Sequence, residues 1–571
     1  MRFKYGFPVV ALIGVASVSG AWAVVNQATR DVGRSPVQRL RASSAASAST
    51  VQPAASQAQG KSPSASFPLE FRTIEGYDNN SLNPDLGAID TPFMRLADAD
   101  YADGVSAPAG SHRPSARAVS NAVSAQVDSI PNEAGASDYL WQWGQFLDHD
   151  IDETPIADPA EAFEIEVPTG DPFFDPGATG EVTIALDRSA WGLHGGQREQ
   201  INLITTYIDA SNVYGSEDER AEALRRLDGS GKLKTSRGEF LPLNLEGLPN
   251  APTHRDPSLF LAGDVRANEQ AGLIVMHTLF VREHNFWAER LAQLGMVGED
   301  ALYETARAIV AAEMQAITYN EFLPVLLGPH ALPEYEGYDP AVDPRIANEF
   351  ATAGYRVGHT MLSSTLRRVG PDGSTIAQGD IRLARAFFSP PVVTSVGLDP
   401  YLRGLAAQQA QEIDPFVIDD VRNFLFGPPG SDGFDLVSLN IQRGRDHGLA
   451  SYADLRRALG LRAPSGFEGV SSDPEVVDRL ASVYDSVEDI DAWVGLLSED
   501  HVPGALVGEG LHALLVDQFN RLRDGDRFWY QSYLPPRIAR EIDRQTLAVI
   551  IRRNSGVGNE LPDDVFHVSA E

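Results

Sequence analysis

Apolar residues recur at helical spacing in one stretch that also carries several acids and a histidine. The stretch is residues 137–155, SDYLWQWGQFLDHDIDETP. Its apolar positions are Leu140, Trp143, Leu147 and Ile151. They follow one another at intervals of three and four residues, so they share one face of a helix. The pattern predicts an amphipathic helix whose apolar face is buried.

The same stretch predicts a second, polar face on that helix. Gln145, Asp148 and His149 are related by three and four positions, so an amide, a carboxylate and an imidazole are directed to one side. Asp150 and Asp152 add further acids among aromatic residues, which is costly unless charges or metal ions satisfy them. A structural histidine among capping acids and a proton-transferring histidine both remain possible at this point.

A later segment has a similar pattern. In FATAGYRVGHTMLSSTLRR, residues 350–368, one apolar stripe consists of Phe350, Gly354, Val357 and Met361. A neighbouring stripe consists of Tyr355, His359 and Leu362. A histidine on the buried side of a helix is either hydrogen-bonded core or an axial metal ligand. From its own surroundings, the core histidine is favoured.

Three further segments concentrate polar residues. TTYIDASNVYGSE offers the alternating oxygens of Thr205, Asp209 and Ser211 with the Tyr207 carbonyl, a pattern that suits either calcium or an ordinary turn before a helix near Ser216. LAGDVRANEQAGLIVMHTLFVREHN is expected to be helical, with one face consisting of Arg266, Glu269 and Gln270. Its histidines 277 and 284 are seven apart, a spacing that argues against a zinc protease. In SLNIQRGRDHG, a polar cluster consists of Asn440, Arg443, Arg445, Asp446 and His447.

Composition narrows the class of protein. The 571 residues are 43% hydrophobic, which is enough for a large core, and 50 Gly and 37 Pro indicate many loops between mainly helical segments. The formal charge of −33 disfavours nucleic acid and anionic membranes as partners. The chain has no cysteine, so disulfides and thiol chemistry are excluded.

The N-terminal region divides into two parts. Residues 1–23 combine a basic start, a short apolar run and an Ala-Trp-Ala end, which predicts a secretory signal peptide and a secreted or periplasmic protein; an uncleaved anchor helix is the alternative. No other stretch is apolar enough to span a membrane. Residues 24–68, rich in Ala, Ser and Gln, predict a flexible linker. We expect one large domain over residues 69–571.

Taken together, the segments resemble the animal haem peroxidase family of the peroxidase–cyclooxygenase superfamily. The resemblance runs in order along the chain through these stretches: FRTIEGYDNNSLNP, PFMRLADADYADGVS, RPSARAVS, WGQFLDHDID, TTYIDASNVYGSE, LAGDVRANE, MHTLFVREHN, YRVGHT, LNIQRGRDHG and QFNRLRDGDRFWY. It implies a mainly α-helical domain with little β-structure.

The resemblance also implies roles around a haem. His149 matches the distal histidine, with Gln145 beside it, and Arg266 matches the distal arginine. His359 matches the proximal iron ligand, and Asn440 matches the amide that holds its imidazole, as a neutral acceptor that keeps the iron electron-poor. Arg443 matches the arginine that pairs with a haem propionate, and Asp148 and Glu269 match the carboxylates that form esters with haem methyl groups.

A calcium site follows from the same resemblance. The matching ligands are Asp150, Thr205, Tyr207 (by its carbonyl), Asp209 and Ser211. The sequence departs from the family at Gln270, where some members have a methionine that forms a sulfonium link to haem. It also lacks the family's disulfides.

The implied function is a secreted peroxidase that reduces hydrogen peroxide and oxidises a small donor such as a halide, thiocyanate or a phenol. The first alternative is a fatty-acid dioxygenase of the same superfamily. Those enzymes carry a radical-forming tyrosine three residues before the proximal histidine, where this chain has Arg356; Tyr355, four before, is expected to point elsewhere. The second alternative is a non-catalytic adhesion or matrix protein, which would not need His149, Arg266 and His359 together.

Overall fold

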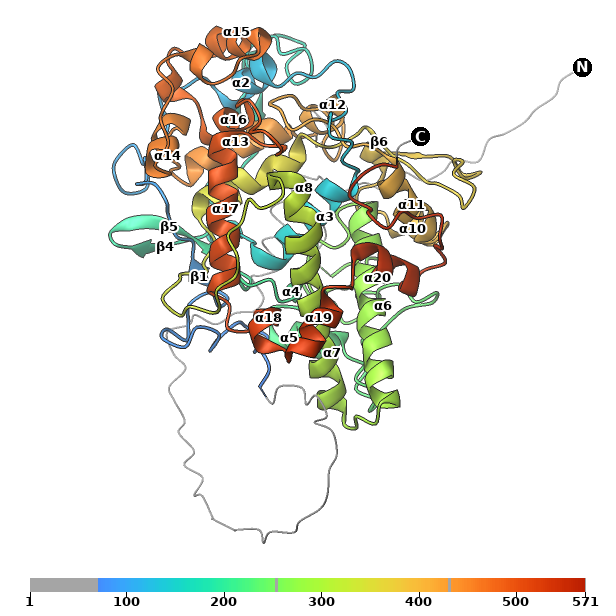
Figure 1. The fold of residues 1–571 in the computed structure, drawn as a ribbon. Helices are drawn as coiled ribbons and strands as arrows, with labels where there is room; N and C mark the ends of the chain where they lie inside the picture. Colours follow the sequence, from blue (N-terminus) through green and yellow to red (C-terminus); the bar gives the residue numbers. More distant parts are fainter. Residues whose placement is uncertain (1–69, 252–254, 430–432, 570–571) are drawn as a thin grey trace, which may run out of the picture.

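In the computed structural model, described for residues 70–251, 255–429 and 433–569, helices dominate and strands are few and short (Figure 1). The mainly α-helical prediction is confirmed. The predicted signal peptide and linker lie outside the described residues. Within the described ranges, no helix is long and apolar enough to cross a membrane.

In the described part of the chain, six helices of ten or more residues form the framework. They are α3 (Tyr139–Ile151), α6 (Ala271–Gln293), α7 (Glu299–Ile317), α13 (Leu436–Asp446), α15 (Pro474–Val483) and α17 (Glu509–Asp524). In Figure 1, α6 and α7 run side by side, and they pack along each other. α3 also packs on α6.

Shorter helices complete the shell. They are α2 (Ala116–Val123), α4 (Ser211–Tyr214), α5 (Asp218–Leu224), α8 (Leu323–Leu327), α9 (Asn348–Thr352), α10 (Pro390–Thr394), α11 (Asp399–Ala407), α12 (Asp419–Arg422), α14 (Tyr452–Ala458), α16 (Ala492–Leu497), α18 (Tyr530–Tyr533), α19 (Pro536–Ile542) and α20 (Leu547–Asn554). A π-helical turn, η2 (Thr318–Phe322), joins α7 to α8, and the 3₁₀ turns are η3 (Gly354–His359), η4 (Leu383–Arg385), η5 (Phe467–Gly469) and η6 (Val487–Asp489).

The described strands form small antiparallel sheets. β4 (Trp191–His194) and β5 (Gln197–Asn202) form a hairpin, and β1 (Thr91–Pro92) pairs with the other edge of β5, with Thr91 opposite Asn202. β2 (Ile165–Glu166) pairs with β3 (Thr183–Ile184), and β6 (Thr365–Leu366) pairs with β7 (Ile381–Arg382).

α3 forms where the pattern predicts it, and it is buried on almost every side. The apolar side chains of Trp143 and Leu147 are fully buried, and His149 on the polar side is also almost completely buried. A helix that is buried all round lies in the interior rather than on the surface. The polar face of α3 is therefore directed at an internal space.

The other predicted helices end or begin differently from the expectation. Arg266 and Glu269 lie in turns before α6, which begins only after Gln270, because the Gln270 side chain caps the helix by accepting from Gly272 N at 2.5 Å. The segment around His359 is not one helix either: α9 stops at Thr352, Ala353 is non-helical, and a 3₁₀ turn follows.

Candidate active site

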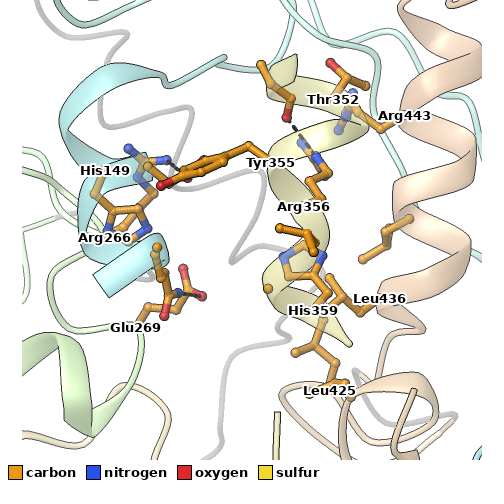
Figure 2. A pocket seen from close by; sticks show the side chains of 18 of the residues that line it. His149, Arg266, Glu269, Thr352, Tyr355, Arg356, His359, Leu425, Leu436 and Arg443 are labelled. Atoms are coloured by element: carbon orange, nitrogen blue, oxygen red, sulfur yellow. Dashed lines mark hydrogen bonds and ion pairs between the residues drawn. The ribbon is translucent and has the colours of Figure 1, made fainter. Parts of the chain in front are cut away.

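A cavity lies between α3, the turns before α6, and the 3₁₀ turn η3. Seven of the predicted site residues line it: Gln145, Asp148, His149, Arg266, Glu269, His359 and Arg443. Figure 2 shows His149, Arg266 and Glu269 on one side and His359 with Arg356 on the other. The two histidines are thus on opposite walls of one space, although 210 positions in the sequence separate them.

His149 is buried and electrically neutral. Burial, followed by the charge of Arg266, lowers the pKa of His149 well below its ordinary value. Its Nδ1 lies 3.6 Å from Asp264 Oδ1 and has no hydrogen-bond partner in the described part of the chain. A neutral imidazole directed into a cavity can take up a proton from a ligand.

Arg266 is fixed beside His149 by an acid that the sequence reasoning did not single out. Its Nε and Nη2 donate to the Asp264 carboxylate at 3.0 and 2.8 Å, and Nη2 also donates to the Asp152 carbonyl at 3.0 Å. Although burial opposes the effect, Arg266 holds the pKa of Asp264 well below its usual range. The sequence could have pointed to Asp264, because this residue lies within LAGDVRANE, one of the stretches that resemble the family.

Two predicted carboxylates lie on the same side as His149. Burial, opposed by Arg266, raises the pKa of Glu269 to about 7 and that of Asp148 to about 6. Gln145 Nε2 donates to Glu269 Oε1 at 3.0 Å, and Asp148 lies 3.7 Å from Arg266 Nη1. Both acids are therefore partly protonated near neutral pH.

On the opposite wall, His359 ends the η3 turn and contacts Asn440 of α13. Burial, followed by the nearby Arg356 charge, lowers the pKa of His359 to about 3, so the ring is neutral. Its Nδ1 lies 2.8 Å from the Asn440 side-chain nitrogen. The expected contact is present.

The orientation of the Asn440 amide differs from the expected acceptor role. Arg356 Nη1 donates to Asn440 Oδ1 at 3.0 Å, so the amide nitrogen is the atom that faces His359. The physical reason is the 3₁₀ geometry, in which residues three apart eclipse each other and Arg356 is brought next to the ring of His359. A buried guanidinium needs acceptors, and Asn440 Oδ1 is one of them.

Tyr355 also contradicts the expectation that it points away from the site. It lines the cavity, and Figure 2 shows its ring reaching from η3 toward His149 and Arg266. The ring stacks on Phe350 at a centroid distance of 4.7 Å, and its hydroxyl has no hydrogen-bond partner among the described residues. The turn at Ala353 and the 3₁₀ geometry redirect this side chain.

Arg443 lies at the cavity and is held by acceptors from its own helix and from the segment 187–189. Its Nη1 donates to the Asp187 carbonyl, Ser189 Oγ and Asp446 Oδ2, each at 2.9 Å. The other two guanidinium nitrogens, Nε and Nη2, take no part in these three hydrogen bonds. An anionic group in the cavity would find a fixed cation here.

Behind His149, the neighbouring Asp150 points away from the cavity into a second polar cluster. Ser211 Oγ donates to Asp150 Oδ1 at 2.9 Å, and Thr205 Oγ1 donates to Asp209 Oδ2 at 3.1 Å. Burial, followed by repulsion from Asp209, raises the pKa of Asp150 well above its usual range. The Tyr207 hydroxyl donates to the Leu86 carbonyl, so its side chain is engaged elsewhere.

The histidines of α6 do not form a metal site. His277 packs edge-on against Phe146, and His284 contacts the Tyr214 hydroxyl at 2.9 Å and the Gly231 carbonyl at 2.8 Å. Across the described ranges, no group of three or more His, Asp or Glu side chains is placed to hold a metal ion. The cluster at Asp150 differs because it relies on two carboxylates together with hydroxyl and carbonyl oxygens.

Comparison with known proteins agrees with this arrangement. The animal haem peroxidase family matches residues 71–566. The chain belongs to the animal haem peroxidase family.

Individual relatives support the assignment. Peroxinectin A from Dictyostelium discoideum is 36% identical over 515 residues, which cover 86% of this chain and 95% of that protein. The solved structure of peroxidase A from the same organism superposes with a TM-score of 0.82 at 34% identity, over 88% of this chain and 100% of that one. A fatty acid α-dioxygenase from Oryza sativa shares the fold, with a TM-score of 0.74 at 20% identity over 87% of each chain.

Asp264 offers a direct test of how the site of this peroxidase-family chain is held. We expect Asp264→Asn to destabilise the protein by roughly 3–5 kcal/mol, because the change leaves the buried Arg266 charge without its counter-ion. Urea unfolding measures the loss. Asp478→Asn, a change at an exposed acid, is the control and should stay within about 0.5 kcal/mol of the original. Equal unfolding midpoints for the two variants would contradict the role of Asp264.

Proposed function

We propose that this chain is a haem peroxidase that reduces hydrogen peroxide and oxidises a small donor. The observation that carries the proposal is the pair of neutral, buried histidines on opposite walls of one cavity, with a fixed arginine beside His149. Membership of the animal haem peroxidase family supports a haem as the group between them. The donor class includes halide, thiocyanate and phenols.

The residues at the cavity suit a haem. His359 offers a neutral imidazole whose Nε2 has the correct chemistry for an iron ligand once the ring proton stands on Nδ1, which requires the Asn440 amide to turn its oxygen to the ring. Arg443 offers donors for a carboxylate at the cavity edge. When bound, the haem supplies the redox-active iron that accepts oxidising equivalents from peroxide.

The chain's own residues would handle the proton and the charge. Neutral His149 takes a proton from the bound peroxide and returns it to the oxygen that leaves as water. Arg266, immobilised by Asp264, stabilises the negative charge that grows on the leaving oxygen. Because both groups are fixed before the reaction, little reorganisation is needed.

Substitution of His359 and substitution of His149 are expected to impair the protein in different ways, the first in haem binding and the second in the reaction with peroxide. His359→Ala should abolish the characteristic haem absorption of the bound cofactor, since the axial ligand is lost. His149→Ala and Arg266→Ala should keep haem but lower the rate of peroxide reaction by roughly 10²–10⁴-fold for the missing proton shuttle. Absorption spectra and stopped-flow rates measure the two effects.

One control and three outcomes decide this test. His194→Ala, in the β4 hairpin and exposed, should behave as the original protein. An unchanged haem spectrum in His359→Ala would overturn the axial assignment. Oxygen uptake with a fatty acid, without peroxide turnover, would instead favour the dioxygenase alternative, to which the position of Tyr355 in the cavity lends support. Haem-free protein would favour the non-catalytic alternative.

We also propose a calcium ion at Asp150, Thr205, Tyr207, Asp209 and Ser211. The fit rests on two buried carboxylates that repel each other, surrounded by hydroxyl groups, where a divalent cation would neutralise both. Calcium takes 6–8 oxygen ligands, and this set supplies carboxylate, hydroxyl and carbonyl oxygens. Bound there, calcium would hold Asp150 and therefore its neighbour His149.

Removing one calcium ligand should affect the distal histidine indirectly. Asp209→Ala is expected to lower the calcium content and also the peroxide rate, because displacement of His149 by about 1 Å can cost about 10²-fold. Elemental analysis and rates on the same samples measure both. Asp218→Ala, an exposed acid in α5, is the control. Full activity in haem-loaded protein that contains no calcium would refute the site.

A covalent haem is a further part of the proposal. Asp148 and Glu269 line the cavity on the His149 side, and ester formation with ring methyl groups would neutralise two acids that are costly to bury as charges. After peroxide treatment, we expect the haem to stay with the protein on acid–solvent extraction, and to be released from the double variant Asp148→Asn, Glu269→Gln. Free haem from the treated original protein, with unmodified peptides around both acids, would rule out the esters.

The proposed location is outside the cytoplasm. Support comes from residues 1–23, whose basic start, apolar run and small-residue end are typical of a signal peptide.

A further inference from the structure

Glu153 is an acid at the cavity that the proposed chemistry does not use. It follows the end of α3, lines the same cavity as His149 and Arg266, and is only 6% exposed. Its Oε1 is buried and has no hydrogen-bond partner among the described residues. A buried carboxyl oxygen without a partner is costly unless a ligand satisfies it.

Hydrogen bonds hold the peptide groups of Glu153 in place beside the cavity. Glu153 N donates to Asn202 Oδ1 at 2.9 Å, and Leu203 N donates to the Glu153 carbonyl at 2.8 Å. Asn202 Nδ2 also donates to the Ile151 carbonyl at 2.9 Å, which ties the end of β5 to the end of α3. The Cα of Glu153, from which its side chain starts, is therefore held at the cavity wall.

The nearby cations lower the cost of a charge on Glu153, but they form their short contacts with other groups. Arg266 forms its short contacts with Asp264 and with the Asp152 carbonyl. Arg220 donates to the Ala262 carbonyl at 2.9 Å and to the Pro249 carbonyl. The charged groups that face Glu153 are Asp152, Glu217, Arg220, Asp264 and Arg266. Burial, opposed by Arg266, raises the pKa of Glu153 to about 7.

The wider cavity lining carries charges of both signs, so a preference between cations and anions rests on Glu153 itself. Its acids are Asp148, Asp152, Glu153, Asp187 and Glu269, against three arginines, Arg266, Arg356 and Arg443. The lining histidines do not add positive charge: the pKa of His359 is lowered to about 3, and those of His149 and His447 lie well below the ordinary value, with burial as the first cause in each case. Beyond Glu153, the uncharged side chains of Thr154 and Ile156 continue the cavity lining.

We propose that Glu153 determines the specificity of this site for its reducing substrate, by favouring small aromatic donors that carry an ammonium group over anions of the same shape. This inference rests on the proposed peroxidase function. A cationic N–H group satisfies the partnerless oxygen of Glu153 with a charge-assisted hydrogen bond. An anion is instead repelled by the negative charge of this carboxylate. The preference grows as the pH rises through neutrality, because Glu153 then carries its charge.

Two phenols of nearly equal size test the inference. Tyramine carries an ammonium group, and 4-hydroxyphenylacetate carries a carboxylate; their dissociation constants on the haem-loaded full chain are measured by calorimetry at pH 5.5 and pH 8, without peroxide. At pH 8 we expect tyramine to bind about tenfold more tightly than 4-hydroxyphenylacetate, the size of one charge-assisted hydrogen bond. At pH 5.5 the ratio should fall toward one.

The Glu153→Gln variant keeps the shape and removes the charge. It should show the same low ratio at both pH values, whereas Glu222→Gln, at an exposed acid of α5, should behave as the original. Glu153→Asp keeps the charge and should retain a preference for tyramine. This second variant tests the inference even if Glu153→Gln folds poorly. An unchanged ratio and pH response in Glu153→Gln would overturn the inference, as would equal binding of both phenols by the original protein at pH 8.

Peroxide consumption, measured separately on the same samples, keeps the two proposals apart. A chain that consumes no peroxide but whose tyramine preference disappears in Glu153→Gln would overturn the proposed function and support the role of Glu153. If the chain consumes peroxide while Glu153→Gln leaves both affinities unchanged, the proposed function is supported and the role of Glu153 is overturned.

Discussion

The ion pair between Asp264 and Arg266 is the interaction on which the rest of the site depends. Asp264 accepts two side-chain donors of Arg266, and its backbone nitrogen donates to the Asn212 carbonyl at 3.0 Å. Asn212 in turn donates from its side chain to the Phe146 carbonyl of α3. One residue, Asp264, therefore connects the turn before α6, the α4 segment and the helix that carries His149, through its carboxylate and its backbone nitrogen. Without it, a buried guanidinium would lack its counter-ion.

This connection explains why so many ionisable groups can be buried around one cavity. A charge inside a protein is stable only when it is paired, and otherwise the group becomes neutral. Arg266 and Asp264 follow the first course, while His149 and His359 follow the second through lowered pKa values. The result is a cavity with a fixed cation beside neutral proton acceptors, an arrangement suited to moving a proton while stabilising a developing negative charge.

Helical periodicity predicted the part of the site that lies on regular helix, whereas Arg266, Glu269 and His359, which lie in turns, came from the family resemblance. The 3.6-residue period of α3 placed Gln145, Asp148 and His149 on one face, and the structure has them at one cavity. Where the backbone leaves the α-helix, the same reasoning failed. In a 3₁₀ turn, each residue advances about 120° instead of about 100°, so residues four apart, such as Tyr355 and His359, diverge widely. Periodicity gives no warning of such a turn, because it depends on the break at Ala353.

The Gln270 position shows how a polar side chain at the cavity can orient its neighbours. Its Oε1 caps α6 at Gly272, and its Nε2 donates to Gln142 at 2.6 Å and to Gln145 Oε1 at 3.2 Å. Because the Gln145 oxygen is engaged in this way, its amide nitrogen is turned toward Glu269. A methionine here could neither cap the helix nor orient Gln145. The Gln270 amide thus orients Gln145, and through Gln145 it sets the hydrogen bond that the Glu269 carboxylate accepts at the cavity wall.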